Sequence, residues 1–354
     1  MTGERLPPPQ STPGRLGGRG RPLIAALLAL AVLCGCSGGT RALPKPLAAA
    51  PEPAASHQPA AAPAGRLVAV GRQPEGIVFD APTDTLVVAV RGTRPGLDLL
   101  DGTSGRLRAF VPLDGAARHL ALAGPGGPVL VPNETDDRLD VVSLPEGKLL
   151  SSIPVGRQPH DAAALGGTYM VSNELADSVD LISASAPARV IPAPLQPGGV
   201  AADASTFVVV GVRARELAAY RPDGTLIAKV ACGQGPTHVV AGPGGYYYVA
   251  DTNGGALLVF DVTASSVRQV ARIPVGAAPY GLEADPASGW VFVTLTGSNQ
   301  VVGLRLSAAK VTARRLWATA RQPNSVALDT GGGFLAVTAT AEDRVELIPV
   351  GGGS

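Results

Sequence analysis

The sequence has little cysteine and no excess of charge of either sign. Its 29 Lys and Arg residues nearly balance its 28 Asp and Glu residues, and this near-neutral charge gives no support for nucleic-acid binding. Only three cysteines are present, at positions 34, 36 and 232. We therefore expect no disulfide framework.

Motifs for nucleophilic catalysis and for phosphate binding are also missing. No Gly-x-Ser-x-Gly sequence is present, and Cys232 has no paired His in sequence, so we interpret Cys232 as a packed thiol. The glycine turns 242–245 and 331–333 are followed by neither Lys-Ser nor Lys-Thr, which excludes a phosphate loop. Trp290 and Trp317 are interpreted as strand packing.

The N-terminus carries an export signal. Four Arg residues precede an apolar run of 11 residues, Leu23 to Leu33, which is too short to span a bilayer comfortably. The sequence that follows, Leu33-Cys34-Gly35-Cys36, resembles the lipobox of bacterial lipoproteins, in which the last cysteine receives lipid. The alternative is an ordinary secretory signal with an incidental cysteine pair, but the apolar run and Gly35 stand in register with Cys36 for lipidation.

Four segments follow from this interpretation. Residues 1–35 are a lipoprotein signal peptide, and 36–65 are the lipidated Cys36 with an Ala/Pro-rich linker whose composition cannot bury a core. Residues 66–350 are one repeat domain, and 351–354 are a flexible tail. We therefore expect a monomer anchored to the cell membrane through the lipid on Cys36, at the cell surface or in the periplasm.

A phrase built around a proline recurs through the domain. The full copies are Val70-Gly71-Arg72-Gln73-Pro74, Val155-Gly156-Arg157-Gln158-Pro159 and Val275-Gly276-Ala277-Ala278-Pro279. Weaker copies place the seven anchor positions at 74, 117, 159, 197, 236, 279 and 323, about 40 residues apart. Seven such periods are typical of a seven-bladed β-propeller.

Within each period the apolar pattern has period 2, so the blades consist of strands. The fullest period has Tyr246-Tyr247-Tyr248-Val249-Ala250, a turn, and then Ala256-Leu257-Leu258-Val259-Phe260. The last period supplies only three strands, at 325–329, 334–338 and 344–350. Residues 66–70 precede the first anchor and have no blade of their own. We expect them to supply the missing strand and so close the ring.

The repeat resembles the YVTN repeat family of seven-bladed propellers, which includes YncE-like proteins. The shared features are Gly-x-x-Pro, a short strand, a Gly turn, a strand that ends in Ala or Ser with Asn or Asp, and a Val-rich strand. The resemblance covers residues 66–350 and implies an all-β propeller of four-stranded blades. It implies little about function, because propellers bind, scaffold or catalyse.

Three histidines follow the anchors closely. His119, His160 and His238 come one or two residues after the anchors of blades 2, 3 and 5, near the start of the innermost strand. We expect them around one mouth of the central channel. The loops between the second and third strands lie on the same face, and in these blades they carry polar residues: Asn133, Glu134, Asn173, Glu174 and Asp251.

These residue types suggest a ligand site or a divalent metal ion at the channel mouth. The alternative is structural: Asn and Asp satisfy turn backbones, Glu is solvated, and each His bonds a neighbouring blade. The sequence contains no metal-binding spacing such as His-x-x-x-His that would decide between the ligand site and the structural alternative. Tyr280 is a further ligand-binding candidate, because Glu75, Asp161, Tyr280 and Asn324 lie just after the anchors where the blades differ.

Arginines also recur near the anchors. Arg72, Arg157 and Arg321 repeat within the phrase, and we interpret them as interblade contacts. Arg91, Arg118 and Arg213 fall near the same mouth, and together they would attract an anion.

Two functions are consistent with these features. The first is a membrane-tethered propeller that binds a small ligand or an envelope protein through the channel-mouth face, without catalysis. The second is a propeller enzyme, either a lactonase or a metal-dependent lyase that resembles streptogramin lyase. In that case His238 would be the base, and Glu134 or Glu174 would help to hold the metal. The sequence favours binding.

Overall fold

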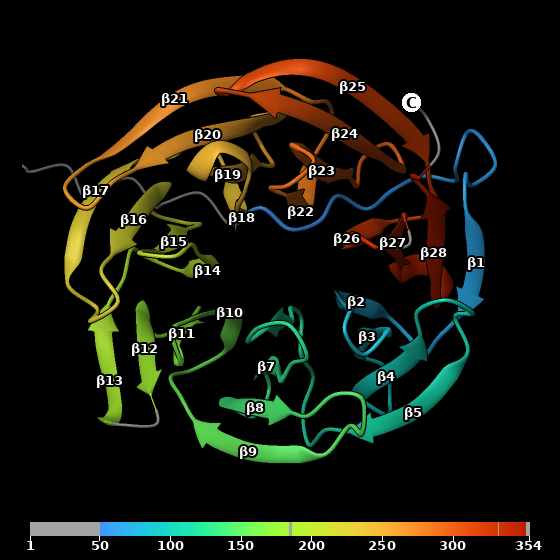
Figure 1. The fold of residues 1–354 in the computed structure, drawn as a ribbon, viewed down its shortest axis with the longest axis horizontal. Helices are drawn as coiled ribbons and strands as arrows, with labels where there is room; N and C mark the ends of the chain where they lie inside the picture. Colours follow the sequence, from blue (N-terminus) through green and yellow to red (C-terminus); the bar gives the residue numbers. More distant parts are fainter. Residues whose placement is uncertain (1–49, 184–185, 332, 352–354) are drawn as a thin grey trace, which may run out of the picture. The chain divides into compact units, whose positions relative to one another are not determined.

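The computed structural model describes residues 50–183, 186–331 and 333–351. The predicted signal peptide, Cys36 and most of the predicted tail lie outside these residues. The described chain forms seven four-stranded antiparallel sheets arranged in a ring (Figure 1). The prediction of a seven-bladed propeller is therefore confirmed. None of the helices in this part of the chain is long and apolar enough to span a bilayer.

The first four blades are built from consecutive strands. Blade 1 consists of β2 (Pro74–Asp80), β3 (Thr85–Val90), β4 (Gly96–Asp101) and β5 (Leu107–Pro112). Blade 2 consists of β6 (Ala121–Leu122), β7 (Val129–Asn133), β8 (Arg138–Val142) and β9 (Leu149–Pro154). Blade 3 consists of β10 (Pro159–Leu165), β11 (Thr168–Asn173), β12 (Ser178–Ser183) and β13 (Ala186–Pro192). Blade 4 consists of β14 (Pro197–Ala202), β15 (Phe207–Gly211), β16 (Glu216–Tyr220) and β17 (Leu226–Ala231).

The remaining blades include the one that closes the ring. Blade 5 consists of β18 (Pro236–Ala241), β19 (Tyr246–Asp251), β20 (Ala256–Val262) and β21 (Val267–Pro274). Blade 6 consists of β22 (Pro279–Asp285), β23 (Trp290–Leu295), β24 (Gln300–Ser307) and β25 (Lys310–Ala318). Blade 7 consists of β26 (Pro323–Asp329), β27 (Phe334–Ala339), β28 (Arg344–Pro349) and β1 (Arg66–Ala69). Two short 3-10 turns, Pro243–Gly245 and Thr340–Glu342, are the helical elements of the described chain.

The ring closes as the sequence predicts. β1 pairs antiparallel with β28, with Arg66 opposite Leu347 and Ala69 opposite Arg344. The N-terminal strand thus becomes the outermost strand of the last blade, and the ring is left without an open blade (Figure 1). Closure removes the exposed sheet edges that would otherwise flank a gap.

The hydrophobic cores lie between neighbouring blades. In one of them Val208 of blade 4 packs with Tyr247 and Phe260 of blade 5, and all three are fully buried. The second strand of a blade is therefore apolar on both faces, as in β15, where every residue is buried. This explains why Val-rich runs, rather than alternating patterns, mark the second strands in the sequence.

The recurring phrase before each anchor proline forms a turn with a specific interblade contact. Gln73, Gln158, Gln196 and Gln322 adopt left-handed φ angles of 52° to 63°. Their backbone N–H groups donate to the side-chain oxygens of Asp343, Asp137, Asp177 and Asn299, at 2.7 to 2.9 Å. The repeated phrase thus holds the start of each innermost strand in place.

Candidate functional site

The start of the innermost strand is irregular, and this irregularity sets which side chains face the channel. In six blades the pairing register shifts directly after the anchor proline. A bulge of this kind re-aims side chains. Blade 2 differs, because its anchor is Ala117, which forms only an isolated bridge with Asn133, and its strand β6 begins four residues later.

As a result, two successive positions of each blade surround the channel. The residues one after the anchor are Glu75, Arg118, His160, Gly198, Thr237, Tyr280 and Asn324. The residues two after the anchor are Gly76, His119, Asp161, Gly199, His238, Gly281 and Ser325. Gly199 and Gly281 are needed for close approach, because a Cβ there would lie within 2.8 Å of the next blade's backbone.

The three predicted histidines meet inside the channel. His119 and His238 face each other with 3.0 Å between their Nε2 atoms. The ring centroids of His119 and His160 are 4.7 Å apart. One ring nitrogen of each of the three lies within 4.8 Å of the others. All three side chains are buried, so residues separated by 119 positions in the chain form one cluster, which we call the histidine cluster.

Two of the imidazoles are oriented by oxygen acceptors behind them. His238 directs Nδ1 at the Tyr280 carbonyl oxygen, 3.1 Å away, and the Tyr280 ring packs edge-on against His238. His160 directs Nδ1 at Glu134 Oε1 and Glu174 Oε2, at 3.2 and 3.3 Å. Glu134, Glu174 and Tyr280 therefore belong to the site, although each one holds a histidine rather than lining open space.

Charges around His160 are closely paired. Glu134 also binds Arg91 Nη1 at 2.8 Å and Arg118 Nε at 3.3 Å, and Glu174 accepts hydrogen bonds from the side chains of Gln158 and Gln196. Burial opposes the charge of His160, but its hydrogen bonds to both carboxylates outweigh burial and raise its pKa to about 9. Burial and the charge of His160 lower the pKa of His238 to about 3, and burial lowers the pKa of His119 well below its usual range.

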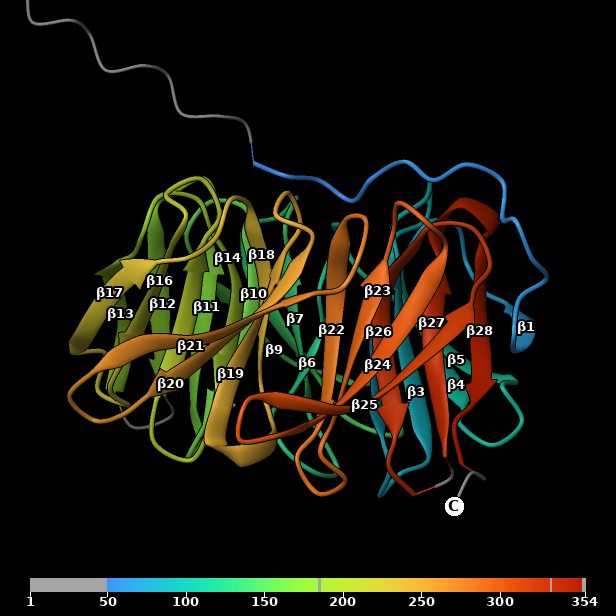
Figure 2. The ribbon, with the colours of Figure 1, turned by 90° about the horizontal axis from the view of Figure 1, so that it is seen from above.

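The channel end beside His160 is closed. Residues 50–65 cross this face of the ring as an extended segment without helix or strand (Figure 2). Glu52 Oε2 accepts a hydrogen bond from Arg118 at 2.9 Å, the Ala54 N–H donates to Thr296 at 3.1 Å, and Asn299 donates to the His57 carbonyl at 3.0 Å. The space left between this segment, His160 and Glu174 is about 10 Å³. The mouth where the sequence suggested ligand binding is therefore filled by the protein's own side chains.

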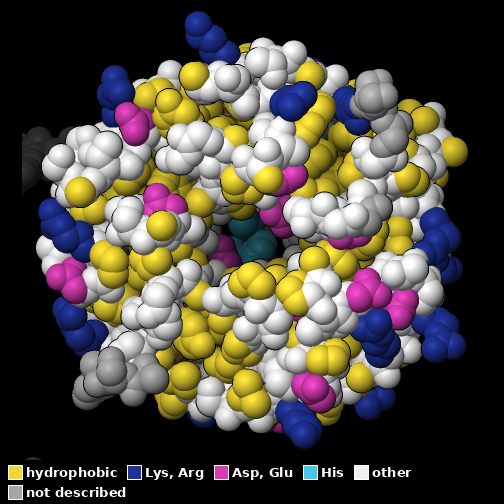
Figure 3. Space-filling model, viewed as in Figure 1, with side chains coloured by type: hydrophobic (Ala, Val, Ile, Leu, Met, Phe, Trp, Pro, Cys, Tyr) yellow, Lys and Arg dark blue, Asp and Glu magenta, His cyan; other side chains and the backbone are white. Residues whose placement is uncertain are grey.

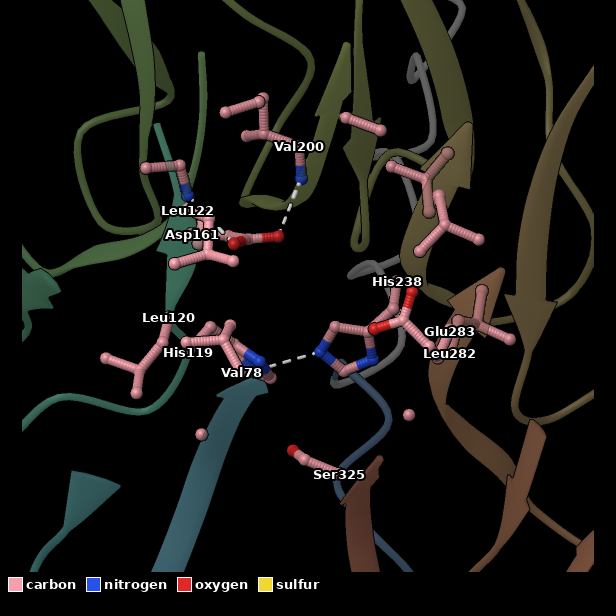
Figure 4. Close-up of a pocket in the computed structure, with 18 of the residues that line it drawn as sticks. Val78, His119, Leu120, Leu122, Asp161, Val200, His238, Leu282, Glu283 and Ser325 are labelled. Carbon is pink, nitrogen blue, oxygen red and sulfur yellow. Dashed lines mark hydrogen bonds between the residues drawn. The ribbon is translucent and has the colours of Figure 1, made fainter. Parts of the chain in front are cut away.

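The other end of the channel is an open cavity of about 390 Å³, which we call the central cavity. Figure 3 shows its entrance, with histidine and acidic side chains visible at depth. His119 and His238 form its floor, and apolar residues such as Val78 and Leu122 line its wall (Figure 4). Two carboxyls, Asp161 and Glu283, also line it.

Neither of these carboxyls forms an ion pair among the described residues, although the charge of His160 acts on Asp161 and opposes the effect of burial on its pKa. Asp161 accepts hydrogen bonds from the backbone N–H groups of Val200 and Ala162, at 2.9 and 2.8 Å, and Glu283 accepts one from Ala284 at 2.8 Å. Burial raises the pKa of Asp161 to about 6 and that of Glu283 to about 7. Asp161 and Glu283 are thus the two carboxyl groups that line the cavity.

Sequence reasoning missed Glu283, although the repeat carried a signal. Glu283 lies four residues after its anchor, and the equivalent residues of the other blades are Val78, Ala121, Ala163, Ala201, Val240 and Ala327. A carboxyl at a position that is otherwise Val or Ala breaks the repeat. Comparison of the blades at this depth would have identified it.

Other predicted residues have structural roles. Asn133 and Asn173 donate to Asp140 and Asp180, and Asp251 accepts hydrogen bonds from the N–H groups of its own turn and of the 234–235 segment. The hydrogen bonds of these three residues therefore stabilise turns. Cys232 is fully buried in an apolar core, and burial raises the pKa of its thiol, as expected of a packed residue.

The arginines near the anchors divide into those that bind a carboxylate and those that are exposed or bind a backbone carbonyl. Arg91 and Arg118 bind Glu134, so their charges are used within the protein. Arg157 donates to the Leu175 carbonyl, and Arg72 is largely exposed with Asp343 at 3.9 Å. Arg213 is exposed. Of the arginines predicted near the mouth, Arg91 and Arg118 are therefore not free for an anion.

The fold is similar to that of several solved structures. No family model matches the chain, and no curated protein matches it in sequence. Virginiamycin B lyase from Staphylococcus aureus superposes with a TM-score of 0.67 at 13% identity, covering 80% of this chain and 97% of that one. Hydrazine synthase from Kuenenia stuttgartiensis gives 0.64 at 18% identity, covering 79% and 96%. A chain of the mitotic checkpoint complex gives 0.69 at 11% identity, covering 82% and 94%. At such identities these similarities show the propeller fold alone.

Proposed function

We propose that this protein is a ligand-binding lipoprotein of the cell envelope, in which the central cavity takes a small molecule that carries an amine. In this proposal the chain is a YVTN-like propeller exported by residues 1–35 and held to the membrane by lipid on Cys36. The linker would carry the propeller clear of the membrane surface. A Cys36→Ser chain should accordingly lose its association with the membrane fraction.

The observation that carries the ligand class is a pair of cavity-lining carboxyls that form no ion pair in the described part of the chain. Asp161 and Glu283 line a cavity of about 390 Å³, and among the described residues neither of them forms an ion pair. A buried carboxylate without a partner is unfavourable, so a ligand that supplies a positive charge and hydrogen-bond donors gains energy there. The apolar wall around Val78 and Leu122 suits the hydrocarbon part of such a ligand.

The alternative is an enzyme, either a lactonase or a lyase like the streptogramin lyases. It would use His238 as a base, but burial and the charge of His160 lower the pKa of His238 to about 3. A base is most efficient when its pKa is near the working pH, so His238 is poorly suited to take a proton at neutral pH. Glu134 and Glu174 both face His160 rather than the cavity, which further favours binding over catalysis.

A thermal-shift experiment tests the proposal. The purified full chain, stripped of metal with a chelator, is heated with primary amines of increasing size and with the matching carboxylic acids. At about 100 times its Kd, a fitting amine stabilises by about 2.7 kcal/mol, which corresponds to about 5 °C in Tm. The acids should have no effect.

The variant Asp161→Asn combined with Glu283→Gln should lose this response, because it removes both negative charges from the cavity. Glu216→Gln, on the outer part of blade 4, is the matched control and should respond like the unchanged protein. Equal stabilisation by amines and acids, or an undiminished response of the double variant, would reject an amine ligand.

A further inference from the structure

The floor of the central cavity has the geometry of a metal centre. We propose that His119, His160 and His238 bind one divalent transition-metal ion of the Zn²⁺ class. This inference goes beyond the proposed function, because it concerns a metal site at the cavity floor, whereas the amine ligand would contact the carboxyls of the cavity wall. Neither proposal depends on the other.

The spacing of the nitrogens fits a single ion. Zinc is bound by imidazole at about 2.0 to 2.1 Å in a tetrahedral arrangement, which places two ligand nitrogens about 3.3 Å apart. The Nε2 atoms of His119 and His238 are 3.0 Å apart, and His160 offers a nitrogen within 4.8 Å of both. The dashed line in Figure 4 joins the two Nε2 atoms at the cavity floor.

The hydrogen bonds behind the rings are those of metal-ligating histidines. Such a histidine usually directs its other ring nitrogen at a carboxylate or a backbone carbonyl, which fixes the ring and its tautomer. His238 has the Tyr280 carbonyl oxygen in that role, at 3.1 Å, and His160 has Glu134 and Glu174, at 3.2 and 3.3 Å. In both residues Nε2 is the nitrogen left for an ion.

The surrounding charge also favours a cation. Five buried or half-buried carboxyls surround the channel, against the guanidinium groups of Arg91 and Arg118; the carboxyls are Glu75, Glu134, Asp161, Glu174 and Glu283.

The donor set selects the class of metal. Three imidazoles suit Zn²⁺, Cu²⁺, Ni²⁺ or Co²⁺, whereas Mg²⁺ and Ca²⁺ require oxygen ligands. Three protein ligands leave a fourth position open, and the cavity of about 390 Å³ lies directly beside His119 and His238. A ligand or a water molecule in the cavity would complete the coordination.

The competing explanation is a direct hydrogen bond between His119 and His238, which holds the two rings without any ion. That bond uses only two of the three imidazoles. It predicts no metal affinity, so the two explanations separate by measurement.

The test is zinc titration of the chelator-treated full chain by calorimetry, followed by metal analysis after dialysis. We expect one Zn²⁺ per chain. His119→Gln should weaken binding at least 100-fold, and it is the variant least disruptive to folding, because the described hydrogen bond of this ring is the one to His238. Glu174→Gln should weaken binding about 10- to 100-fold through the orientation of His160. His57→Gln removes the exposed histidine of the 50–65 segment and should bind zinc like the unchanged protein.

Cobalt gives a second measurement that needs no variant. Co²⁺ in the unchanged protein should give the intense visible absorption of a tetrahedral site, and zinc should displace it. Absence of stoichiometric zinc, or equal affinity in His119→Gln and His57→Gln, would overturn the metal site. Either result would leave the amine experiment untouched, because that experiment uses metal-free protein and variants at Asp161 and Glu283.

Discussion

The two ends of the channel are built from the same seven blades, yet their carboxyl groups differ in whether they form ion pairs. At the closed end, Glu134 and Glu174 contact arginine, histidine and glutamine side chains, and residues 50–65 cover the remaining space. At the open end, Asp161 and Glu283 accept hydrogen bonds from backbone N–H groups, form no ion pair within the described chain, and line a cavity of about 390 Å³.

This difference teaches how a repeat protein separates stability from function. Removal of a buried carboxylate that has several charged partners lowers the free energy of unfolding, because each partner is left without an opposite charge. A buried carboxyl without partners costs stability in the empty protein and regains it when a ligand arrives. The paired charges of the closed end thus stabilise the fold, and the open end is where we propose that a ligand binds.

The largest expected effect is at the closed end. Glu134→Ala leaves the half-buried Arg91 and Arg118 without this carboxylate, and we expect a loss of about 3 kcal/mol in the free energy of unfolding. Denaturant unfolding at neutral pH measures it. Glu216→Ala, which breaks the exposed pair with Lys229, should cost about 1 kcal/mol or less. Similar losses in the two variants would contradict the assignment of the closed end.

An effect of opposite sign is expected at the open end. Burial raises the pKa of Glu283 from 4.5 to about 7, so between these values the folded protein binds more protons than the unfolded chain. The stability contributed by Glu283 therefore falls as pH rises through this window. Glu283→Gln should abolish the fall and gain about 2 kcal/mol at pH 8, allowing for water in the cavity, with almost no gain at pH 4.

Unfolding curves across pH 4 to 8 provide the measurement for Glu283. Glu146→Gln, which changes an exposed turn carboxyl, should leave the pH profile as it is. A Glu283→Gln profile parallel to that of the unchanged protein would show that this carboxyl is already well solvated or paired.

The smallest expected effect concerns the covering segment. The Glu52 side chain is 64% exposed, so its ion pair with Arg118 contributes little. Glu52→Ala should change the free energy of unfolding by less than about 1 kcal/mol. Hydrogen exchange at the Ala54 N–H should quicken nevertheless, since the segment loses one of its attachments. A large loss of stability would make this segment part of the propeller's core structure.

Much of the fold could be predicted from particular residues. The seven recurring anchors predicted seven blades, because each blade must repeat the same turn and the same buried strands. The seven sheets of the structure confirm this number. The three-stranded last period predicted pairing with residues 66–70, and the pairing of β1 with β28 confirms it. The anchors also predicted that His119, His160 and His238 lie around the channel.

Other features could not be predicted from the sequence. Asn133, Asn173 and Asp251 looked like ligands, but they bond nearby residues, because a side chain at a turn satisfies local backbone and side-chain groups first. The closed mouth depends on contacts between Glu52 and Arg118 and between His57 and Asn299, which are separated by 66 and 242 positions. Local patterns do not contain such contacts.

The sequence by itself determined the number of blades, their strands, the closing strand and the presence of three histidines close to the anchors. These follow from local turn chemistry and from short apolar runs, bounded by turns, that recur about every 40 residues. Only the tertiary structure decided which channel end is open, which carboxyls are paired, and that three imidazoles from blades 2, 3 and 5 meet. The reason is geometric: distances across the ring depend on its curvature and on the bulge at each innermost strand, and both are properties of the packed blades.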